Sequence, residues 1–180
     1  MDSFPAIEID KVKVWDFRLA NINTSECLNV AYGVDANYLD GVGVSITSIV
    51  LNNRHINLDF YIIADVYNDG FFQKIAKLAE QNQLRITLYR INTDKLQCLP
   101  CTQVWSRAMY FRLFAFQLLG LTLDRLLYLD ADVVCKGDIS QLLHLGLNGA
   151  VAAVVKDVEP MQEKAVSRLS DPELLGQYFN

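Results

Sequence analysis

The sequence contains no long, uncharged apolar run. Its most apolar stretch is interrupted by Arg112 and Gln117, so no segment reaches the ~18 apolar residues that a membrane-spanning helix needs. The first ten residues, MDSFPAIEID, also lack the basic start and apolar centre of a secretory signal. These two absences predict a soluble protein of the cytoplasm.

Positive charge is scarce. The chain has 16 Lys and Arg against 21 Asp and Glu, which gives a formal net charge of -5. Because nucleic-acid binding needs a basic surface, this balance indicates no nucleic-acid partner. An anionic ligand would have to be bound by a few placed cations or by a metal ion.

Several signatures of catalysis are also missing. There is no Gly-x-Ser-x-Gly, no Walker loop and no complete Gly-x-Gly-x-x-Gly, and His55 and His144 are isolated. Cys98 and Cys101 form a CxxC, but no second cysteine pair has the spacing of a zinc site. We interpret the pair as two thiols in a loop before a helix, the alternative being a redox pair with a low thiol pKa.

What the sequence does contain is an alternation of apolar segments. With 180 residues, 52 % of them apolar, the chain suits one ordinary globular domain. The periodicity predicts strands over 28–33, 58–64, 84–91, 126–129 and 150–155, and helices over 42–51, 71–79, 106–119 and a short stretch ending at Leu143. We expect residues 84–91 to lie near a sheet edge and residues 106–119 to be buried nearly all round. Such an order predicts a mostly parallel sheet covered by helices on both faces, with residues 1–27 an unassigned N-terminal extension.

The stretch LLYLDADVVCKGDIS begins as a strand buried on both faces and then turns acidic. In extended backbone Asp130 and Asp132 point the same way, roughly 6 to 7 Å apart, and would repel by roughly 2 to 3 kcal/mol. A divalent hard cation such as Mg²⁺ or Mn²⁺ would relieve that repulsion. The alternative is that one aspartate caps a turn and the other is solvated. We interpret Asp138 as the N-cap of the short helix that follows.

A second polar segment, Val34 to Tyr38, follows the first predicted strand. Ligands of parallel sheets bind beyond the carboxyl ends of the strands. Asp35 and Asn37 could therefore hold a nucleoside by its ring or ribose, although an Asx-turn is the interpretation that these residues favour on their own.

Arg112 lies in the apolar helix AMYFRLFAFQLL and must be paired if it is buried. A diphosphate or sugar hydroxyl would be a functional partner. Asp130 or Asp132 would be a structural partner, and the sequence supports both equally.

Four blocks together resemble glycosyltransferase family 8, whose members are retaining enzymes of the GT-A, Rossmann-like fold. The blocks are VAYGVDANYLDGVGVSITSIV, SRAMYFRLF, RLLYLDADVVCKGDISQL and LLGQYFN. Within the family the chain is most similar to bacterial lipopolysaccharide core glucosyltransferases. The resemblance implies one nucleotide-sugar-binding domain over residues 28–180, with a three-layer α/β/α arrangement.

The implied reaction is transfer of glucose from UDP-glucose to a hexose of the lipopolysaccharide outer core, with Mn²⁺ or Mg²⁺ as cofactor. It would take place on the cytoplasmic face of the inner membrane. By motif position, the residues implied to bind the nucleotide are Gly33, Val34, Asp35, Ala36, Asn37, Tyr38, Asp130 and Ala131. Asp130 and Asp132 would hold the metal, Arg112 would reach toward the donor, and Asn180 would line the donor-sugar and acceptor site.

Members of the family continue beyond the motif that contains Asn180. Their C-terminal part supplies a metal-binding histidine, acceptor contacts and a basic surface for peripheral membrane contact. We therefore expect this chain to be a fragment that binds UDP weakly or fails to turn over.

Two alternative functions are also compatible with the sequence. One is a haloacid-dehalogenase-type phosphohydrolase, in which Asp130 would be phosphorylated and the candidate partners would be Lys156, Asp157 and Lys164. The other is a non-catalytic nucleotide-binding remnant.

Overall fold

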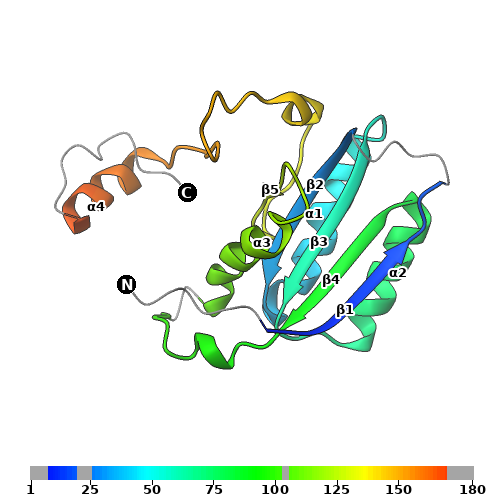
Figure 1. Cartoon of the computed structure of the whole chain (residues 1–180), viewed down its shortest axis with the longest axis horizontal. Coiled ribbons are helices and arrows are strands. Elements are labelled where there is room, and N and C mark those ends of the chain that lie inside the picture. Colours follow the sequence, from blue (N-terminus) through cyan, green and yellow to red (C-terminus); the bar gives the residue numbers. More distant parts are fainter. Residues whose placement is uncertain (1–7, 20–25, 103–105, 170–180) are drawn as a thin grey trace. The chain divides into compact units, whose positions relative to one another are not determined.

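The computed structural model describes residues 8–19, 26–102 and 106–169 (Figure 1). The chain divides into two compact units, residues 1–144 and 145–180. The strands of the first unit are β1 (Ile9–Asp16), β2 (Cys27–Val34), β3 (Asn57–Ala64), β4 (Arg85–Ile91) and β5 (Leu127–Tyr128). Its α-helices are α1 (Leu39–Asn52), α2 (Asp69–Asn82) and α3 (Phe111–Leu119), and its short 3-10 helices are η2 (Ala36–Tyr38), η3 (Asp94–Leu96), η4 (Arg107–Tyr110) and η5 (Ser140–His144). In the second unit, α4 spans Glu159–Leu169.

The strands form a sheet in the order β1-β4-β3-β2-β5. β2, β3, β4 and β5 are parallel, whereas β1 pairs with β4 in the antiparallel sense. The mostly parallel sheet predicted from the sequence is therefore confirmed. Successive strands run in one direction from β2 to β4, and β5 returns to the other side of β2, so the switch point of the topology lies between β2 and β5.

Helices cover both faces of this sheet. On one face, Val42, Ile46 and Ile49 of α1 share a core cluster with Val30 and Tyr32 of β2, and α2 packs against α1 and against β1 and β4. On the other face, α3 packs against Ala31 of β2 and against Tyr61 and Ile63 of β3. Figure 1 shows α3 on the opposite side of the sheet from α1 and α2, which confirms the three-layer arrangement.

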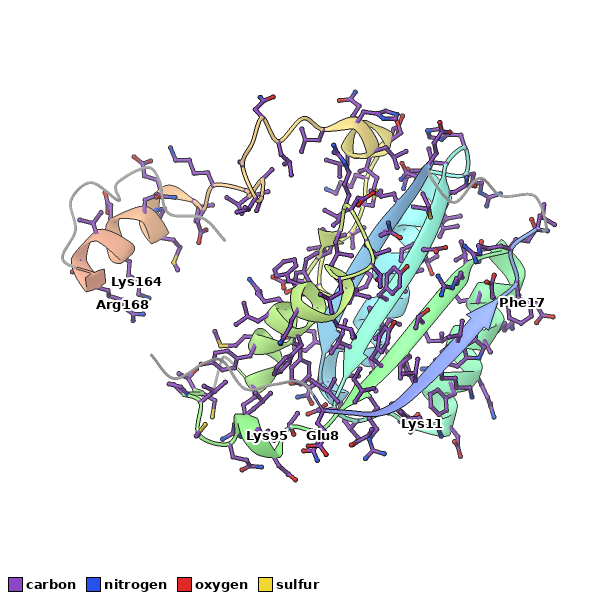
Figure 2. All side chains as sticks on the ribbon, in the orientation of Figure 1. Glu8, Lys11, Phe17, Lys95, Lys164 and Arg168 are labelled. Carbon is purple, nitrogen blue, oxygen red and sulfur yellow. The ribbon has the colours of Figure 1, made fainter. Side chains whose placement is uncertain are left out.

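The N-terminal range left unassigned contains the true edge strand, β1. β1 and β3 flank β4 on its two sides, so residues 84–91 form the strand next to the edge strand, which agrees with the expectation that they lie near a sheet edge. The start of β1 is fixed next to η3: the backbone N–H of Asn92 donates to the Glu8 carbonyl at 2.9 Å, and Figure 2 shows Glu8 beside Lys95, whose Nζ lies 3.6 Å from the Glu8 carboxylate. Lys11 and Lys13 lie on the outer edge, where charged side chains oppose pairing with another chain.

Two strand predictions need correction. β5 is a half-buried strand of two residues at the second edge, and among the described residues it pairs with β2 alone. Residues 150–155 form no strand, and Val151 is fully exposed at 102 %. A buried strand needs a hydrogen-bonded neighbouring strand, and the described residues of the second unit form none.

The predicted helix over 106–119 consists of η4 followed by α3. It is buried on the sheet side only, since Met109, Leu113 and Phe116 are 41–48 % exposed. The expectation of burial all round is wrong because no described residue of the first unit covers the outer side of α3. None of the described helices is both long and apolar enough to cross a membrane.

Candidate functional site

Three carboxylates follow neighbouring strand ends at the carboxyl edge of the sheet. Val34 and Ala64 are register partners at the ends of β2 and β3, so Asp35 and Asp65 leave the sheet side by side. On the other side of β2, the strand β5 leads through Leu129 to Asp130. The acidic residues therefore lie on both sides of the switch point, where open α/β sheets bind their ligands.

Asp130, Ala131 and Asp132 form a turn, in which the Val133 N–H donates to the Asp130 carbonyl at 3.3 Å. The extended backbone assumed for the two aspartates is therefore wrong. Ala131 is buried at 7 % exposure, and its carbonyl oxygen would lie 3.0 Å from a Cβ placed on Gly41. The first turn of α1 thus supports the backbone between the two carboxylates.

Arg112 pairs with Asp130. Its Nη2 lies 3.0 Å from Asp130 Oδ1, and its guanidinium lies 5.3 Å from the centre of the Tyr128 ring. Of the two aspartates considered as structural partners of Arg112, the structure shows the contact with Asp130. The Arg112 Nε is buried and has no hydrogen-bond partner among the described residues, so this guanidinium keeps a donor for a further acceptor.

Tyr128 connects β5, β2 and α3 under the site. The N–H of Gly33 donates to the Tyr128 hydroxyl at 3.1 Å. A Cβ on Gly33 would lie 2.6 Å from Cβ of Phe111 and 2.7 Å from that hydroxyl, so only glycine permits the contact. Burial raises the pKa of Tyr128 to about 12, which keeps the phenol protonated at neutral pH.

Both carboxylate oxygens of Asp35 are occupied. Oδ1 accepts the Asn37 N–H at 2.9 Å and begins η2, and Oδ2 accepts the Ser106 hydroxyl at 2.7 Å. The Asx-turn interpretation of Asp35 is therefore present in the structure. Asn37 is exposed and Tyr38 is 50 % exposed, so their side chains are the accessible ones of this segment.

Asp65 is a site residue that the sequence reasoning missed. Its Oδ1 is buried and accepts no hydrogen bond from the described residues. Burial raises the pKa of Asp65, and the negative charge of Asp35 adds to this effect. The signal was present in the sequence, since IIAD ends an apolar strand in an aspartate as LYLD does, but only two of the strand ends were considered.

Asn53 was also missed, and it fixes the chain that follows the two aspartates. Its side chain is fully buried. Its Nδ2 donates to the carbonyls of Ile49 and Gly137 at 2.9 and 3.3 Å, and its Oδ1 accepts the Ile139 N–H at 2.8 Å. Nothing in the local sequence distinguishes this asparagine from an ordinary helix C-cap, because its partners lie far along the chain.

The remaining predicted residues behave as local structure or cannot be placed. Asp138 accepts the Ser140 N–H at 2.7 Å, which confirms its capping role, and this bond holds the pKa of Asp138 below its usual value. Cys98 and Cys101 are exposed, free thiols in the loop before η4. Asn180 lies outside the described residues.

A hard divalent cation fits the donors that are present. Asp132 is exposed and pairs with no cation among the described residues, and Asp130 keeps one carboxylate oxygen beyond its contact with Arg112. Nowhere in residues 8–19, 26–102 and 106–169 do three or more His, Cys, Asp or Glu residues gather as a metal-binding group. Two carboxylates suit Mg²⁺ or Mn²⁺, which complete their shell with water and substrate phosphate.

Comparison with known proteins connects this geometry to a family. Residues 29–180 match the protein family described as "Glycosyl transferase family 8". A lipopolysaccharide 1,2-glucosyltransferase of Escherichia coli (strain K12) is 99 % identical over 180 residues, which cover all of this chain and 53 % of that protein. A lipopolysaccharide 1,3-galactosyltransferase of Salmonella typhimurium is 38 % identical over 92 % of this chain and 50 % of its own.

Comparison with solved structures shows a similar fold. The solved structure of the galactosyltransferase LgtC, in complex with donor and acceptor sugar analogs, superimposes with a TM-score of 0.63 at 18 % identity, covering 78 % of this chain and 51 % of LgtC. The chain spans about half the length of the relatives that it matches in sequence. Its five-stranded, mostly parallel sheet is that of GT-A glycosyltransferases, and with the match over residues 29–180 it makes this chain a member of glycosyl transferase family 8.

Proposed function

We propose that this chain carries the donor half of a retaining hexosyltransferase, which transfers glucose from UDP-glucose to a hexose of the lipopolysaccharide outer core. The observation that carries the proposal is the placement of Asp35, Asp130 and Asp132 on both sides of the switch point, with Arg112 held beside Asp130. The name of the 99 % identical relative supports glucose as the donor sugar and lipopolysaccharide as the acceptor.

The roles of the residues follow from their chemistry. The segment from Gly33 to Tyr38, with Asn37 and the exposed Tyr38 ring, would hold the uridine. Asp130 and Asp132 would hold Mn²⁺ or Mg²⁺, and Ala131 would contact the nucleotide through its backbone. When bound, the cation would neutralise charge that develops on the diphosphate as UDP leaves.

Arg112 would act at the same diphosphate. Its contact with Asp130 and with the face of the Tyr128 ring fixes the guanidinium before the substrate arrives, and a preorganised cation stabilises developing charge without reorganisation. Asn180 is proposed to line the donor sugar and the acceptor. The enzyme is proposed to work at the cytoplasmic face of the inner membrane, with membrane contact through the half of its relatives that lies outside the aligned residues.

Titration calorimetry with UDP in the presence of Mn²⁺ tests the nucleotide site. We expect Asp132→Asn to weaken UDP binding about tenfold or more, because a charged metal ligand is lost. Asp138→Asn is the matched control, since it changes a carboxylate in the same loop that caps η5 and lies 3.4 Å from His55. Equal UDP affinity in Asp132→Asn and wild type would contradict the proposal.

Transfer of glucose is tested on a chain extended to the length of its relatives. Release of UDP from UDP-glucose by that chain, lost in Asp132→Asn, distinguishes an enzyme from a nucleotide-binding remnant. The phosphohydrolase alternative is set aside because the chain belongs to a glycosyltransferase family.

A further inference from the structure

The carboxyl end of β3 carries a residue without an assigned task. Ala64 is the register partner of Val34, so Asp65 lies beside Asp35 at the same edge of the sheet. Its Oδ1 is buried without a hydrogen-bond donor among the described residues. Buried acceptors are nearly always paired in native proteins, so an unpaired one at a ligand-binding edge calls for a donor from outside the chain.

The backbone N–H groups of Asp65 and Val66 lie near this carboxylate and act to lower its pKa, but neither makes a hydrogen bond to Oδ1, and the neighbouring side chains supply no donor either. Both oxygens of Asp35 already accept hydrogen bonds, from Asn37 and Ser106. The charge of Arg90 acts to lower the pKa of Asp65. The Arg90 guanidinium lies 5.6 Å from the centre of the Tyr67 ring, and its Nε lies 3.7 Å from the Asp10 carboxylate. Of the two adjacent carboxylates, Asp65 is therefore the one with an oxygen that accepts no hydrogen bond from the described residues.

The nucleobases differ in what they offer to such an acceptor. The pyrimidine edge of uracil presents one N–H, at N3, between two carbonyl oxygens, whereas cytosine presents an acceptor at N3. A carboxylate oxygen is acceptor-only when ionised. It would bind uracil and repel the N3 lone pair of cytosine.

We propose that Asp65 Oδ1 accepts the N3–H of the donor's uracil and selects UDP over CDP. This inference rests on the proposed uridine site at Gly33 to Tyr38 and adds the residue that determines base specificity. Asp35 then serves as a positioning residue: it shapes η2 through Asn37 and joins it to the start of η4 through Ser106.

The test compares UDP, CDP and N3-methyl-UDP by calorimetry with Mn²⁺, on wild type and on Asp65→Ala and Asp65→Asn. Wild type should bind UDP about ten- to hundredfold more tightly than CDP or N3-methyl-UDP, the range expected for a hydrogen bond to a charged group. In Asp65→Ala the preference for UDP over N3-methyl-UDP should disappear. In Asp65→Asn the preference over CDP should narrow, because the amide can donate to the cytosine N3.

Asp69→Asn is the control, since Asp69 is an exposed residue in the first turn of α2. This variant should prefer UDP over CDP and over N3-methyl-UDP as strongly as wild type does. If the control variant lost these preferences, the assignment to Asp65 would be overturned. If wild type binds UDP with Mn²⁺ and Asp65→Ala keeps the full preference for UDP, this inference fails while the proposed function stands. If wild type binds no UDP at all, both fail.

Discussion

At the residue scale, close packing explains why residue 33 must be a glycine, and the comparison with Gly43 in α1 shows this. Gly33 lies where β2, α3 and Tyr128 meet, and a Cβ there would approach Phe111 to 2.6 Å. Gly43 lies in α1, and no atom lies within 4 Å of a Cβ placed on it. The same residue type is thus required at one position and replaceable at the other.

We predict that Gly33→Ala lowers the free energy of unfolding by about 1 to 3 kcal/mol, because the methyl group overpacks the junction. Gly43→Ala should raise it by about 0.4 to 1 kcal/mol, since alanine favours the helix and restricts the unfolded chain. Urea denaturation of both variants checks this pair. Equal effects in the two would contradict the close approach at Gly33.

Asp65 also has a consequence for stability. Because its pKa is raised above 3.8 by burial, the folded state binds its proton more tightly than the unfolded state. The contribution of Asp65 to the free energy of unfolding is therefore fully present below pH 3.8 and is lost as the pH rises through the folded-state pKa. At neutral pH the ionised carboxyl is a net cost to the fold.

We therefore expect Asp65→Asn to melt at a higher temperature than wild type at pH 7, where the variant avoids burying a charge. At pH 3 the two should melt alike, since both side chains are then neutral. Calorimetric melts at the two pH values measure the difference. A variant that gains nothing at pH 7, or gains equally at pH 3, would show that burial of Asp65 does not penalise its charge.

At the element scale, α1 supports the acidic turn from both of its ends. Gly41 in its first turn lies under Ala131. At its other end, Ser48 accepts the Cys135 N–H at 2.9 Å, and Asn53 bonds to Gly137 and Ile139. The position of Asp130 and Asp132 therefore depends on a helix that is far away in the sequence.

Asn53→Ala should lower the free energy of unfolding by about 2 to 4 kcal/mol, because it removes a buried amide that bonds to the backbone of Ile49, Gly137 and Ile139. The adjacent Asn52 is exposed and bonds to carbonyls of Ser48 and Cys135, so Asn52→Ala should cost less than about 1 kcal/mol. Chemical denaturation compares the two asparagines. Similar losses would mean that Asn53 does not hold the 135–139 segment.

At the scale of the whole molecule, the N-terminal strand is fastened to the sheet by a charge network. Arg18, just after β1, places Nη1 3.2 Å from both oxygens of Asp59 on β3, and its Nη2 lies 2.6 Å from Asp16. Arg85 of β4 adds a contact of 3.3 Å to Asp59. Asp59 is only 5 % exposed, so its charge requires these partners.

Arg18→Ala is expected to lower the free energy of unfolding by about 1.5 to 3 kcal/mol, the range for hydrogen bonds to charged groups, with Arg85 left as a partial substitute. Lys74→Ala breaks an ion pair of 2.7 Å with Asp40 whose side chains are 68 % and 80 % exposed, and it should change stability by less than about 1 kcal/mol. Denaturation at low and high salt compares the Arg18–Asp59 pair with the exposed Lys74–Asp40 pair, because salt screens exposed charges more than buried ones. A strong salt effect on Arg18 alone would indicate that its pair is solvated and not buried.

Much of this molecule could be predicted from short segments. The strands β2 and β3, the helices α1 and α2 and the capping role of Asp138 follow from apolar periodicity and side-chain chemistry. These features depend on neighbours within a few residues. The segment 150–155 has an equally apolar sequence but forms no strand, because a strand requires a partner that periodicity does not reveal.

The sequence by itself determined the alternation of strands and helices, the family resemblance and the polar residues that follow β2 and β5. Only the tertiary structure decided that β1 is the edge strand beside β4 and that Arg112 pairs with Asp130. It also decided that both carboxylate oxygens of Asp35 accept hydrogen bonds, whereas Oδ1 of the neighbouring Asp65 accepts none from the described residues. The physical reason is that strand order and register bring distant residues to one edge of the sheet. No local pattern in the chain records which strand ends become neighbours.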